Sequence, residues 1–270
     1  MTMIPYAEIH AFTDADVPFT GNPAGVCLLE HFLPDDALLG IAASNNLSET
    51  AFLVPDGADH WQLRWFTPSV EVDLCGHATF ASGAFLFARG LVSGDTASFE
   101  TRSGELKVGR RGQSRFSMDL PKVGYVPAAA NPGVVDALGA GEPIEALEIQ
   151  KVHGANYQML VFEDEAVIAG LEPDHSALAS AFTNVIATAR GRSVDFVSRF
   201  FAPASGVAED PVTGSAHCTL APYWSEKLER PRLSARQIGP RPGALEVEPS
   251  GDRVILEGRA ASYLEGEIRL

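Results

Sequence analysis

The sequence has few cysteines, no excess of basic residues and no hydrophobic run that is long enough to span a membrane. Cys27, Cys75 and Cys218 are an odd number without a CxxC pair, which excludes a disulfide framework and favours a reducing compartment. The charge-free stretch over residues 74–88 is shorter than the ~20 residues of a membrane span. The first ten residues lack a basic region and Glu8 interrupts them, so no secretory signal is expected. These absences together favour the cytoplasm.

Basic residues are outnumbered throughout the chain. Lys and Arg total 20 against 35 Asp and Glu, which gives a formal net charge of −15 and a field that repels phosphate backbones and anionic headgroups. Nucleic acid and membrane surfaces are therefore excluded as expected partners. The 270 residues are 46% hydrophobic, which is ample for one large domain or two small ones.

Familiar catalytic and nucleotide-binding motifs are also missing. The segment 139–141 lacks the third glycine of a dinucleotide fingerprint, and no GxxxxGK[ST] loop occurs. Ser215, His77 and Asp210 are the residue types of a hydrolase triad, but no GxSxG elbow presents the serine. A nucleotide site and a serine hydrolase are thus disfavoured.

A metal centre is the next alternative. Cys75, His77, His217 and Cys218 are zinc-ligand types, but the CxH and HC spacings match no closed zinc pattern. No metal is expected to be required.

The local patterns predict a mixture of strands and helices. Strands are expected at residues 6–12, 24–29, 48–54, 61–66, 97–102, 105–109, 115–120, 149–152, 157–162, 195–201, 245–247 and 253–256. Helices are expected at residues 35–45, 76–88, 132–138 and 173–182. The helix over 76–88 is apolar on every face, so other elements must enclose it, and a strongly curved sheet is the natural enclosure.

An internal similarity indicates two related halves. The segment RWFTP at 64–68 is echoed by RFFAP at 199–203, and each precedes a glycine, Gly76 or Gly214, that opens a helix of small residues. We therefore expect a first domain over residues 1–120 with a central helix at 76–89. A second is expected over 121–270 with a central helix at 214–228, and its terminal strand can return to the first half.

The two helix starts have the chemistry of an anion site. A helix N-terminus presents unpaired N–H groups and a partial positive charge, and glycine lets a ligand approach the backbone. The residues there are Cys75, Gly76, His77, Glu209, Asp210, Thr213, Gly214 and Ser215. Beside them, Glu49 begins an apolar strand, where desolvation would raise the carboxyl pKa toward that of a proton shuttle. Taken alone, Glu49 is better interpreted as an exposed acid at a strand edge.

Four ordered motifs closely resemble the PhzF-like isomerase family of phenazine biosynthesis. They are GNP at 21–23, LSET at 47–50, CGHAT at 75–79 and EDPVTGSA at 209–216, and the likeness covers nearly the whole chain. The resemblance implies the α+β fold of diaminopimelate epimerase, in which two pseudo-symmetric halves each wrap a curved mixed sheet around a central buried helix. It also implies a homodimer, no cofactor, and proton transfer at carbon.

The resemblance carries over to particular residues. It implies that Glu49 is the general acid/base and that His77 and Asp210 accompany it in a cleft between the halves. The anion-holding positions are then Gly76, Gly214 and Ser215, with Cys75 and Thr213 beside the substrate. Two departures matter, because the phenazine enzyme has no thiol at the place of Cys75, and the second thiol of the epimerases falls on Pro211.

The sequence as a whole predicts an isomerase that moves a proton on a small anionic metabolite bearing a carboxylate. Two alternatives stay open. One is an epimerase that uses Glu49 and Cys75 on opposite faces of the substrate, and the other is a non-catalytic protein that binds a small anion.

Overall fold

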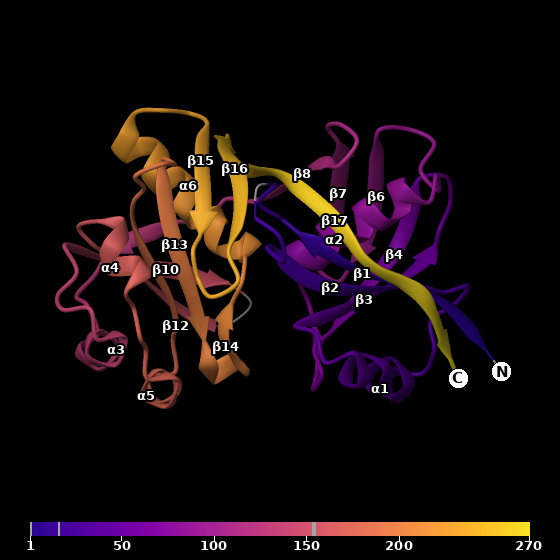
Figure 1. Ribbon diagram of the computed structural model, residues 1–270, viewed down its shortest axis with the longest axis horizontal. Helices are drawn as coiled ribbons and strands as arrows, with labels where there is room; N and C mark the ends of the chain where they lie inside the picture. The colour runs from indigo at the N-terminus through magenta and orange to yellow at the C-terminus, as the bar shows by residue number, and fades with distance from the viewer. Residues whose placement is uncertain (1, 16, 153–154) are drawn as a thin grey trace. The chain divides into compact units, whose positions relative to one another are not determined.

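The chain forms two compact units. The computed structural model describes residues 2–15, 17–152 and 155–270. Contacts group Met1–Leu120 with Leu256–Leu270 as unit 1, and Pro121–Ile255 as unit 2. In Figure 1 the yellow C-terminal strand accordingly lies beside the indigo N-terminal strand. Among the described residues, no helix combines the length and the apolar character that crossing a membrane requires.

Among its described residues, unit 1 contains both helices and all the strands expected in the first half of the chain, and β5 in addition. Its elements are β1 (Met3–Ala11), β2 (Asn22–Leu28), α1 (Asp35–Asn45), β3 (Glu49–Pro55), β4 (His60–Phe66), β5 (Glu71–Val72), α2 (Gly76–Ala88), β6 (Thr96–Thr101), β7 (Gly104–Arg110) and β8 (Arg115–Pro121). The strands β2 and β3 are parallel, β3 and β4 antiparallel, β4 and β6 parallel, and β6 and β7 antiparallel. The sheet is therefore mixed.

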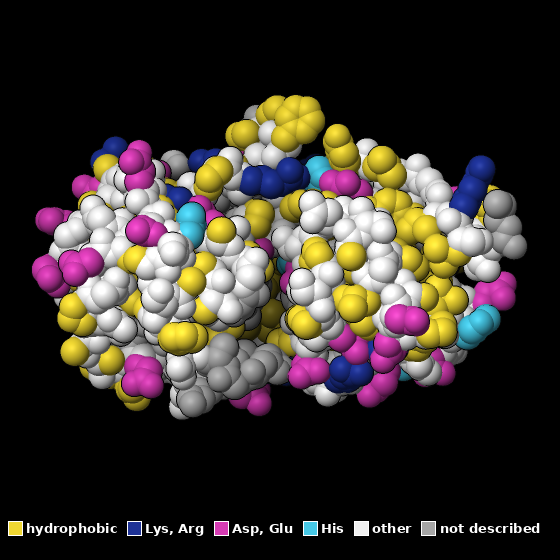
Figure 2. Space-filling view, turned by 90° about the horizontal axis from the view of Figure 1, so that it is seen from below, with side chains coloured by type: hydrophobic (Ala, Val, Ile, Leu, Met, Phe, Trp, Pro, Cys, Tyr) yellow, Lys and Arg dark blue, Asp and Glu magenta, His cyan; other side chains and the backbone are white. Residues whose placement is uncertain are grey.

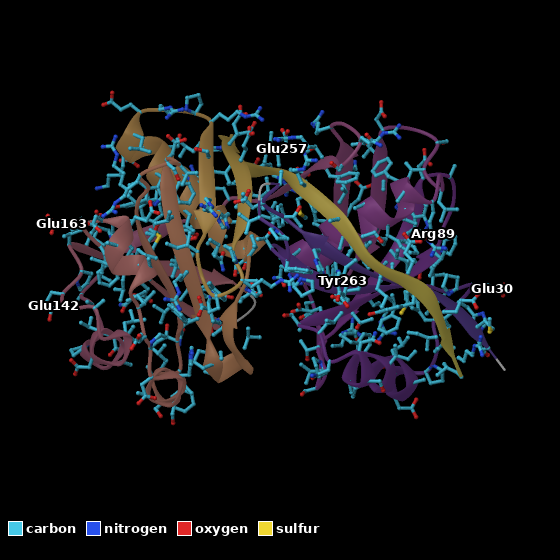
Figure 3. The ribbon with its side chains drawn as sticks, viewed as in Figure 1. Glu30, Arg89, Glu142, Glu163, Glu257 and Tyr263 are labelled. Carbon is cyan, nitrogen blue, oxygen red and sulfur yellow. The ribbon has the colours of Figure 1, made fainter. Side chains whose placement is uncertain are left out.

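The strand β17 (Arg253–Arg269) completes the sheet of unit 1. It pairs antiparallel with β1 along that strand's whole length, from Met3 opposite Arg269 to Ala11 opposite Ala260. It pairs with β8 as well, so the strands follow one another around α2. Tyr263, labelled in Figure 3, stacks on His10 of β1 with ring centroids 4.9 Å apart.

The central helix α2 is enclosed by this sheet. Every residue from His77 to Phe87 is buried, as expected for a helix that is apolar on all faces. Phe80 stacks on Phe12 with ring centroids 4.3 Å apart. A Cβ added to Gly83 would lie 2.5 Å from Val108 of β7, so only glycine allows helix and sheet to approach this closely.

Unit 2 repeats this arrangement with more helices. Its elements are β9 (Tyr125–Pro127), α3 (Pro132–Leu138), β10 (Glu145–Val152), β11 (Ala155–Val161), α4 (Glu165–Ala169), α5 (His175–Ser180), β12 (Asn184–Arg190), β13 (Phe196–Ala202), a 3-10 turn (Pro203–Ser205), β14 (Val207–Asp210), α6 (Gly214–Leu228), β15 (Leu233–Gln237) and β16 (Gly243–Ser250). The strands β11 and β12 are parallel, β12 and β13 antiparallel, β13 and β15 parallel, and β15 and β16 antiparallel. This is the order of pairings in unit 1.

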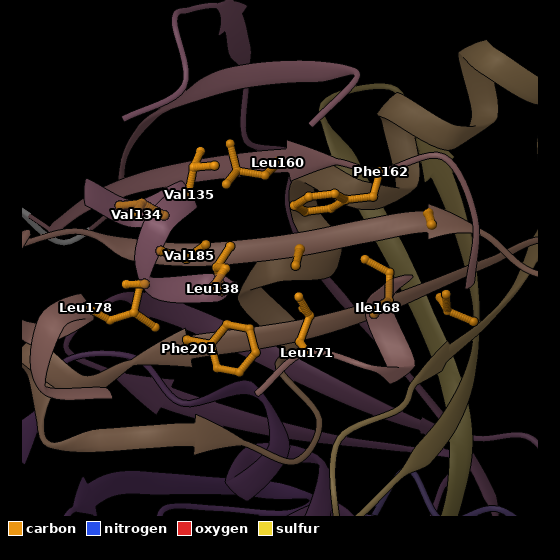
Figure 4. Packing of buried hydrophobic residues seen from close by; sticks show 14 residues of the cluster. Val134, Val135, Leu138, Leu160, Phe162, Ile168, Leu171, Leu178, Val185 and Phe201 are labelled. Atoms are coloured by element: carbon orange, nitrogen blue, oxygen red, sulfur yellow. The ribbon is translucent and has the colours of Figure 1, made fainter. Parts of the chain in front are cut away.

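Both faces of the unit 2 sheet are covered. On one face, side chains of α3, α4 and α5 form a hydrophobic cluster with β11, β12 and β13, in which Leu138, Ile168 and Leu178 are buried (Figure 4). On the other face, α6 packs with Trp224, whose indole N–H donates to the Thr188 hydroxyl at 3.0 Å. The central strand β12 is consequently buried on both faces.

The acidic composition is visible at the surface. On the face shown in Figure 2, Asp and Glu side chains occur at several places among hydrophobic and uncharged ones. Many of the described basic side chains are paired with them, as Arg115 is with Glu257 at 3.1 Å.

Candidate active site

Three of the predicted residues lie together in unit 1. Glu49 is the first residue of β3, Cys75 is the N-cap of α2, and His77 is the second residue of that helix. The strand β3 runs parallel to β2 and beside α2, so the start of the strand and the start of the helix meet at one place. The sequence motifs LSET and CGHAT are joined in this way.

The imidazole of His77 contacts both the thiol and the carboxylate. Its Nε2 is 3.3 Å from Glu49 Oε2, and its Nδ1 is 3.5 Å from Cys75 Sγ. The side chains of His77 and Glu49 are 6% and 15% exposed. One ligand-type atom from each of the three residues lies within 4.8 Å of the others. The cluster is therefore compact, polar and largely shielded from water.

Burial keeps His77 neutral. It lowers the pKa of the imidazole from 6.5 to about 3, although a hydrogen bond with the Pro23 backbone acts in the opposite direction. At neutral pH the ring thus lies against the Glu49 carboxylate without contributing a positive charge.

The GNP motif supports this ring. Gly21 has a φ of +81°, and a Cβ there would lie 2.5 Å from the Ala11 carbonyl oxygen. Only glycine fits this turn, which leads through the fully buried Asn22 to Pro23 and so to His77. The motif is structurally linked to the cluster although it supplies no acid or base.

The remaining predicted residues gather in unit 2, where β14 ends and α6 begins. The Thr213 hydroxyl donates a hydrogen bond to Asp210 Oδ2, so the N-cap side chain holds the carboxylate instead of capping the helix. Gly214 and Ser215 are the first two residues of α6. His217 donates from Nδ1 to the Thr213 carbonyl at 2.7 Å.

Gln237 of β15 holds this loop and was missed by sequence reasoning. It is 1% exposed, its amide nitrogen donates to the Asp210 carbonyl, and its amide oxygen accepts from the Thr213 N–H at 2.9 Å. Gln237 is 24 residues from Thr213 and 27 residues from Asp210 in the sequence, and no local pattern predicts a contact between residues so far apart.

Asn184 and Tyr157 were missed as well. The strand β12 begins at Asn184 opposite Tyr157, just as β3 begins at Glu49 opposite Ala24. Asn184 is hydrogen-bonded to the Tyr157 hydroxyl, whose pKa is raised chiefly by burial and also by the Asp210 charge. These two residues can be identified by comparing the strand pairing of the two units, because Asn184 has the same place in β12 that Glu49 has in β3.

The structure thus collects the predicted residues into two groups. Glu49, Cys75 and His77 form one group beside Gly76, and the residues from Asp210 to Ser215 form the other within unit 2. The zinc set considered from sequence is divided in the same way, since His217 and Cys218 belong to α6. The expectation that both groups share one cleft stays a prediction.

The fold is that of known epimerases. A crystal structure of a hydroxyproline epimerase from Agrobacterium vitis, with bound trans-4-hydroxy-L-proline, matches 99% of this chain and 91% of its own with a TM-score of 0.66 at 13% identity. This likeness concerns the fold alone, and it confirms the expected diaminopimelate epimerase-like architecture.

Closer relatives define the class of protein. An uncharacterized isomerase of Pseudomonas aeruginosa is 47% identical over 264 residues, covering 97% of this chain and 98% of the relative. A crystal structure of a PhzF family protein from Enterococcus faecalis matches with a TM-score of 0.91 and 41% identity, covering 100% of both chains. With this fold and these relatives, the protein is an isomerase.

The sequence also matches the phenazine biosynthesis-like protein family, PhzC-PhzF, over residues 9–266. The chain belongs to this family, which confirms the resemblance inferred from the four motifs.

Proposed function

We propose that the protein is a cofactor-independent isomerase that moves a proton between carbon atoms of a small carboxylate-bearing metabolite. Glu49 is the general acid/base. The observation that carries this proposal is the Glu49 carboxylate, 15% exposed and 3.3 Å from a histidine that burial keeps neutral. A carboxylate in such a place is available as a base and is not neutralised by a cation on this ring.

The reaction needs no external oxidant or reductant. The Glu49 carboxylate takes a proton from a carbon next to an electron-withdrawing group, and the C–H electron pair moves into the conjugated system of the substrate. The protonated Glu49 then returns the proton to another carbon, and the electron pair moves back. His77 stays neutral beside the carboxylate through both steps.

The residues at the start of α6 supply the complementary charge. We assign the substrate anion to the backbone N–H groups at Gly214 and Ser215, together with those at Gly76, because helix N-termini stabilise negative charge. Asp210, held by Thr213, is assigned to a polar group of the same substrate. Donors at these positions would stabilise the enolate that forms when Glu49 removes the proton.

The distances favour one base over two. Two bases on opposite faces of one carbon, each within hydrogen-bond reach, are about 6 Å apart. The donor atoms of Glu49 and Cys75 lie within 4.8 Å of each other and contact the same imidazole. This spacing supports the single-base isomerase against an epimerase that uses Glu49 and Cys75.

Deuterium exchange tests the proposal. Purified protein is incubated with a metabolite extract in heavy water, and compounds that gain deuterium only with enzyme are identified by mass spectrometry. We expect a small carboxylate to gain deuterium with the wild type but not with Glu49→Gln, and its exchange to survive dialysis against a chelator. A ligand that binds both proteins equally and exchanges with neither would establish a non-catalytic binding protein.

We propose that the working form is a homodimer, as the family resemblance implies, and that it acts in the cytoplasm, which the cysteine content favours. Sedimentation equilibrium checks the assembly, since the protomer mass is 28.8 kDa.

A further inference from the structure

We propose that Glu49, Cys75 and His77 form a binding site for a thiophilic divalent cation such as Zn²⁺, and that the bound ion inhibits the enzyme. The site itself follows from the cluster of donor atoms. The inhibition rests on the proposed function, in which Glu49 is the base. The metal is thus a regulator of the site and takes no part in turnover.

The donor set matches the chemistry of zinc. Thiolate sulfur, imidazole nitrogen and carboxylate oxygen are its three usual protein ligands, and bonds of about 2.0–2.3 Å at tetrahedral angles separate the donor atoms by about 3.4 Å. The Glu49 oxygen and His77 Nε2 are already 3.3 Å apart. The Cys75 sulfur lies against Nδ1 and the carboxylate against Nε2, so an ion held by Nε2 requires the Cys75 side chain to rotate toward that nitrogen. One donor atom from each residue lies within 4.8 Å of the other two, so this rotation is short.

The surroundings also suit a ligating histidine. Metal-bound imidazoles are typically oriented by a hydrogen bond from the other ring nitrogen to a backbone carbonyl. The ring of His77 has such a partner in the Pro23 backbone. Cys75 and His77 stand on either side of Gly76 at the first turn of the buried helix α2, so their backbones are held firmly.

The neighbouring pair in unit 2 provides an internal comparison. His217 and Cys218 offer the same donor types, but His217 donates to the Thr213 carbonyl and Cys218 to the Gly214 carbonyl of their own helix. Among the described residues, the potential metal ligands that lie close enough together to share one ion are Glu49, Cys75 and His77. Cys218 is therefore a matched control for Cys75.

Coordination accounts for the inhibition. Three protein ligands leave a fourth position for water or an anion. When the ion binds, the Cys75 S–H proton passes to solvent and the sulfur forms the bond, while a Glu49 lone pair coordinates the metal. That lone pair is the one required to remove the substrate proton, so the ion and catalysis compete.

Cobalt is the spectroscopic probe for this site. Protein stripped with a chelator is titrated with Co²⁺, and we expect one ion per chain with a thiolate-to-cobalt charge-transfer band that Zn²⁺ abolishes by displacement. Cys75→Ser should remove the band, and His77→Gln and Glu49→Gln should each weaken binding at least about tenfold. Cys218→Ser should leave the spectrum unchanged. Circular dichroism confirms the fold of each variant.

A second measurement uses the wild-type protein only. Zn²⁺ should slow the alkylation of Cys75, read by peptide mass spectrometry, without changing that of Cys27 or Cys218. No cobalt band, a band that persists in Cys75→Ser, or alkylation that is unaffected by zinc would overturn the site.

The inhibition is tested separately from the site. Zn²⁺ should stop deuterium exchange at the concentration that fills the site, and exchange that continues at saturation would overturn the inhibitory role. Normal cobalt binding by a protein that catalyses no exchange would support the metal site and contradict the proposed function.

Discussion

The carboxylate of Glu49 and the amide of Asn184 stand at equivalent places in the two units. Each is the first residue of a strand that runs parallel to its neighbour, and each is followed by strands paired in the same order. An amide cannot take up a proton at neutral pH, so in the proposed mechanism only the position in unit 1 can supply the general base. The repeat thus accommodates an asymmetric division of roles.

Substitution of Glu49 and Cys75 tests that division. Removing a general base typically costs about 10²–10⁴-fold in rate, so Glu49→Gln should lose nearly all proton exchange. Cys75→Ser should keep most of the wild-type rate of proton exchange, because in the single-base mechanism the thiol is only a polarizable contact of His77. Exchange rates in heavy water on the identified substrate give both values.

Thermal unfolding of both variants is the control for correct folding. Two folded variants that are equally inactive would contradict the single-base mechanism and favour the epimerase, with Cys75 as the second base.

His217 makes stability depend on pH. Complete burial lowers its pKa from 6.5 to about 4, and the hydrogen bond to Thr213 offsets part of this effect. The unfolded chain therefore binds a proton below pH 6.5 that the native state does not bind until about pH 4. Between these values this one residue should lower the free energy of unfolding by about 1.4 kcal/mol for each unit by which the pH is lowered.

Urea unfolding at several pH values measures the slope. His217→Gln should make this slope shallower by about 1.4 kcal/mol per pH unit. An unchanged slope in His217→Gln would show that the buried ring is not the group responsible.

At the scale of elements, each unit contains an arginine that joins the strand before the central helix to the next short strand. Arg64 of β4 binds Glu71 of β5 through two contacts of 2.7 Å, and Arg199 of β13 binds Glu209 of β14 in the same way. These arginines are the first residues of the repeated RWF and RFF segments. The repeat seen in the sequence is therefore a repeated ion pair that orders the loop leading to α2 or α6.

Loss of one partner of the unit 2 pair should be costly. Arg199 and Glu209 are only 7% and 12% exposed, so Arg199→Met should lower the free energy of unfolding by about 3 kcal/mol by leaving a buried charge unpaired. Arg110→Met breaks the exposed pair with Asp95 and should cost at most about 1 kcal/mol. Urea denaturation measures both.

The double variant Arg199→Met with Glu209→Leu should recover part of the loss. If Arg199→Met proved as mild as Arg110→Met, the pair would not be what holds the loop.

Local patterns predicted the central helices almost to the residue but missed several strands. The first helix was expected over 76–89 and ends at Ala88, and the second spans 214–228 as expected. The strand β12 was missed because burial on both faces removes the alternation of apolar and polar residues that marks a strand. The strand β17 was expected to end at residue 256 but continues to Arg269, because it follows β1.

The candidate site shows the same limit. Motifs predicted Glu49, Cys75 and His77, whose sequence neighbours are distinctive, and the structure brings these three together. Asn184 and Gln237 carry no such neighbours. Their places depend on strand register, which long-range pairing determines and a short window of sequence does not show.

At the scale of the whole molecule, unit 2 is continuous in sequence whereas unit 1 is not. Deleting residues 256–270 removes one of the two antiparallel partners of β1 from unit 1, since β2 remains, but leaves all of residues 121–255. In the truncated protein, unit 1 should therefore unfold while unit 2 stays folded. The reason is that a sheet with a strand removed exposes unpaired backbone groups and core side chains.

Limited proteolysis with mass spectrometry checks this expectation. Residues 1–120 should be digested first, leaving a resistant fragment that covers 121–255, while the full-length chain digested in parallel should resist at both units. Equal loss of both units would show that they unfold together.

The course of β17 also bears on biosynthesis. The first 120 residues leave the ribosome without the strand that β1 requires, and they must wait until residues 256–270 have been made. All of residues 121–255 have been made before that strand is complete, so unit 2 can fold while the nascent chain is still growing. The N-terminal domain usually folds first during synthesis, and here that order is reversed. Until residues 256–270 have been made, the open edge of β1 is exposed to other chains, and this is the interval in which a chaperone would protect the protein most.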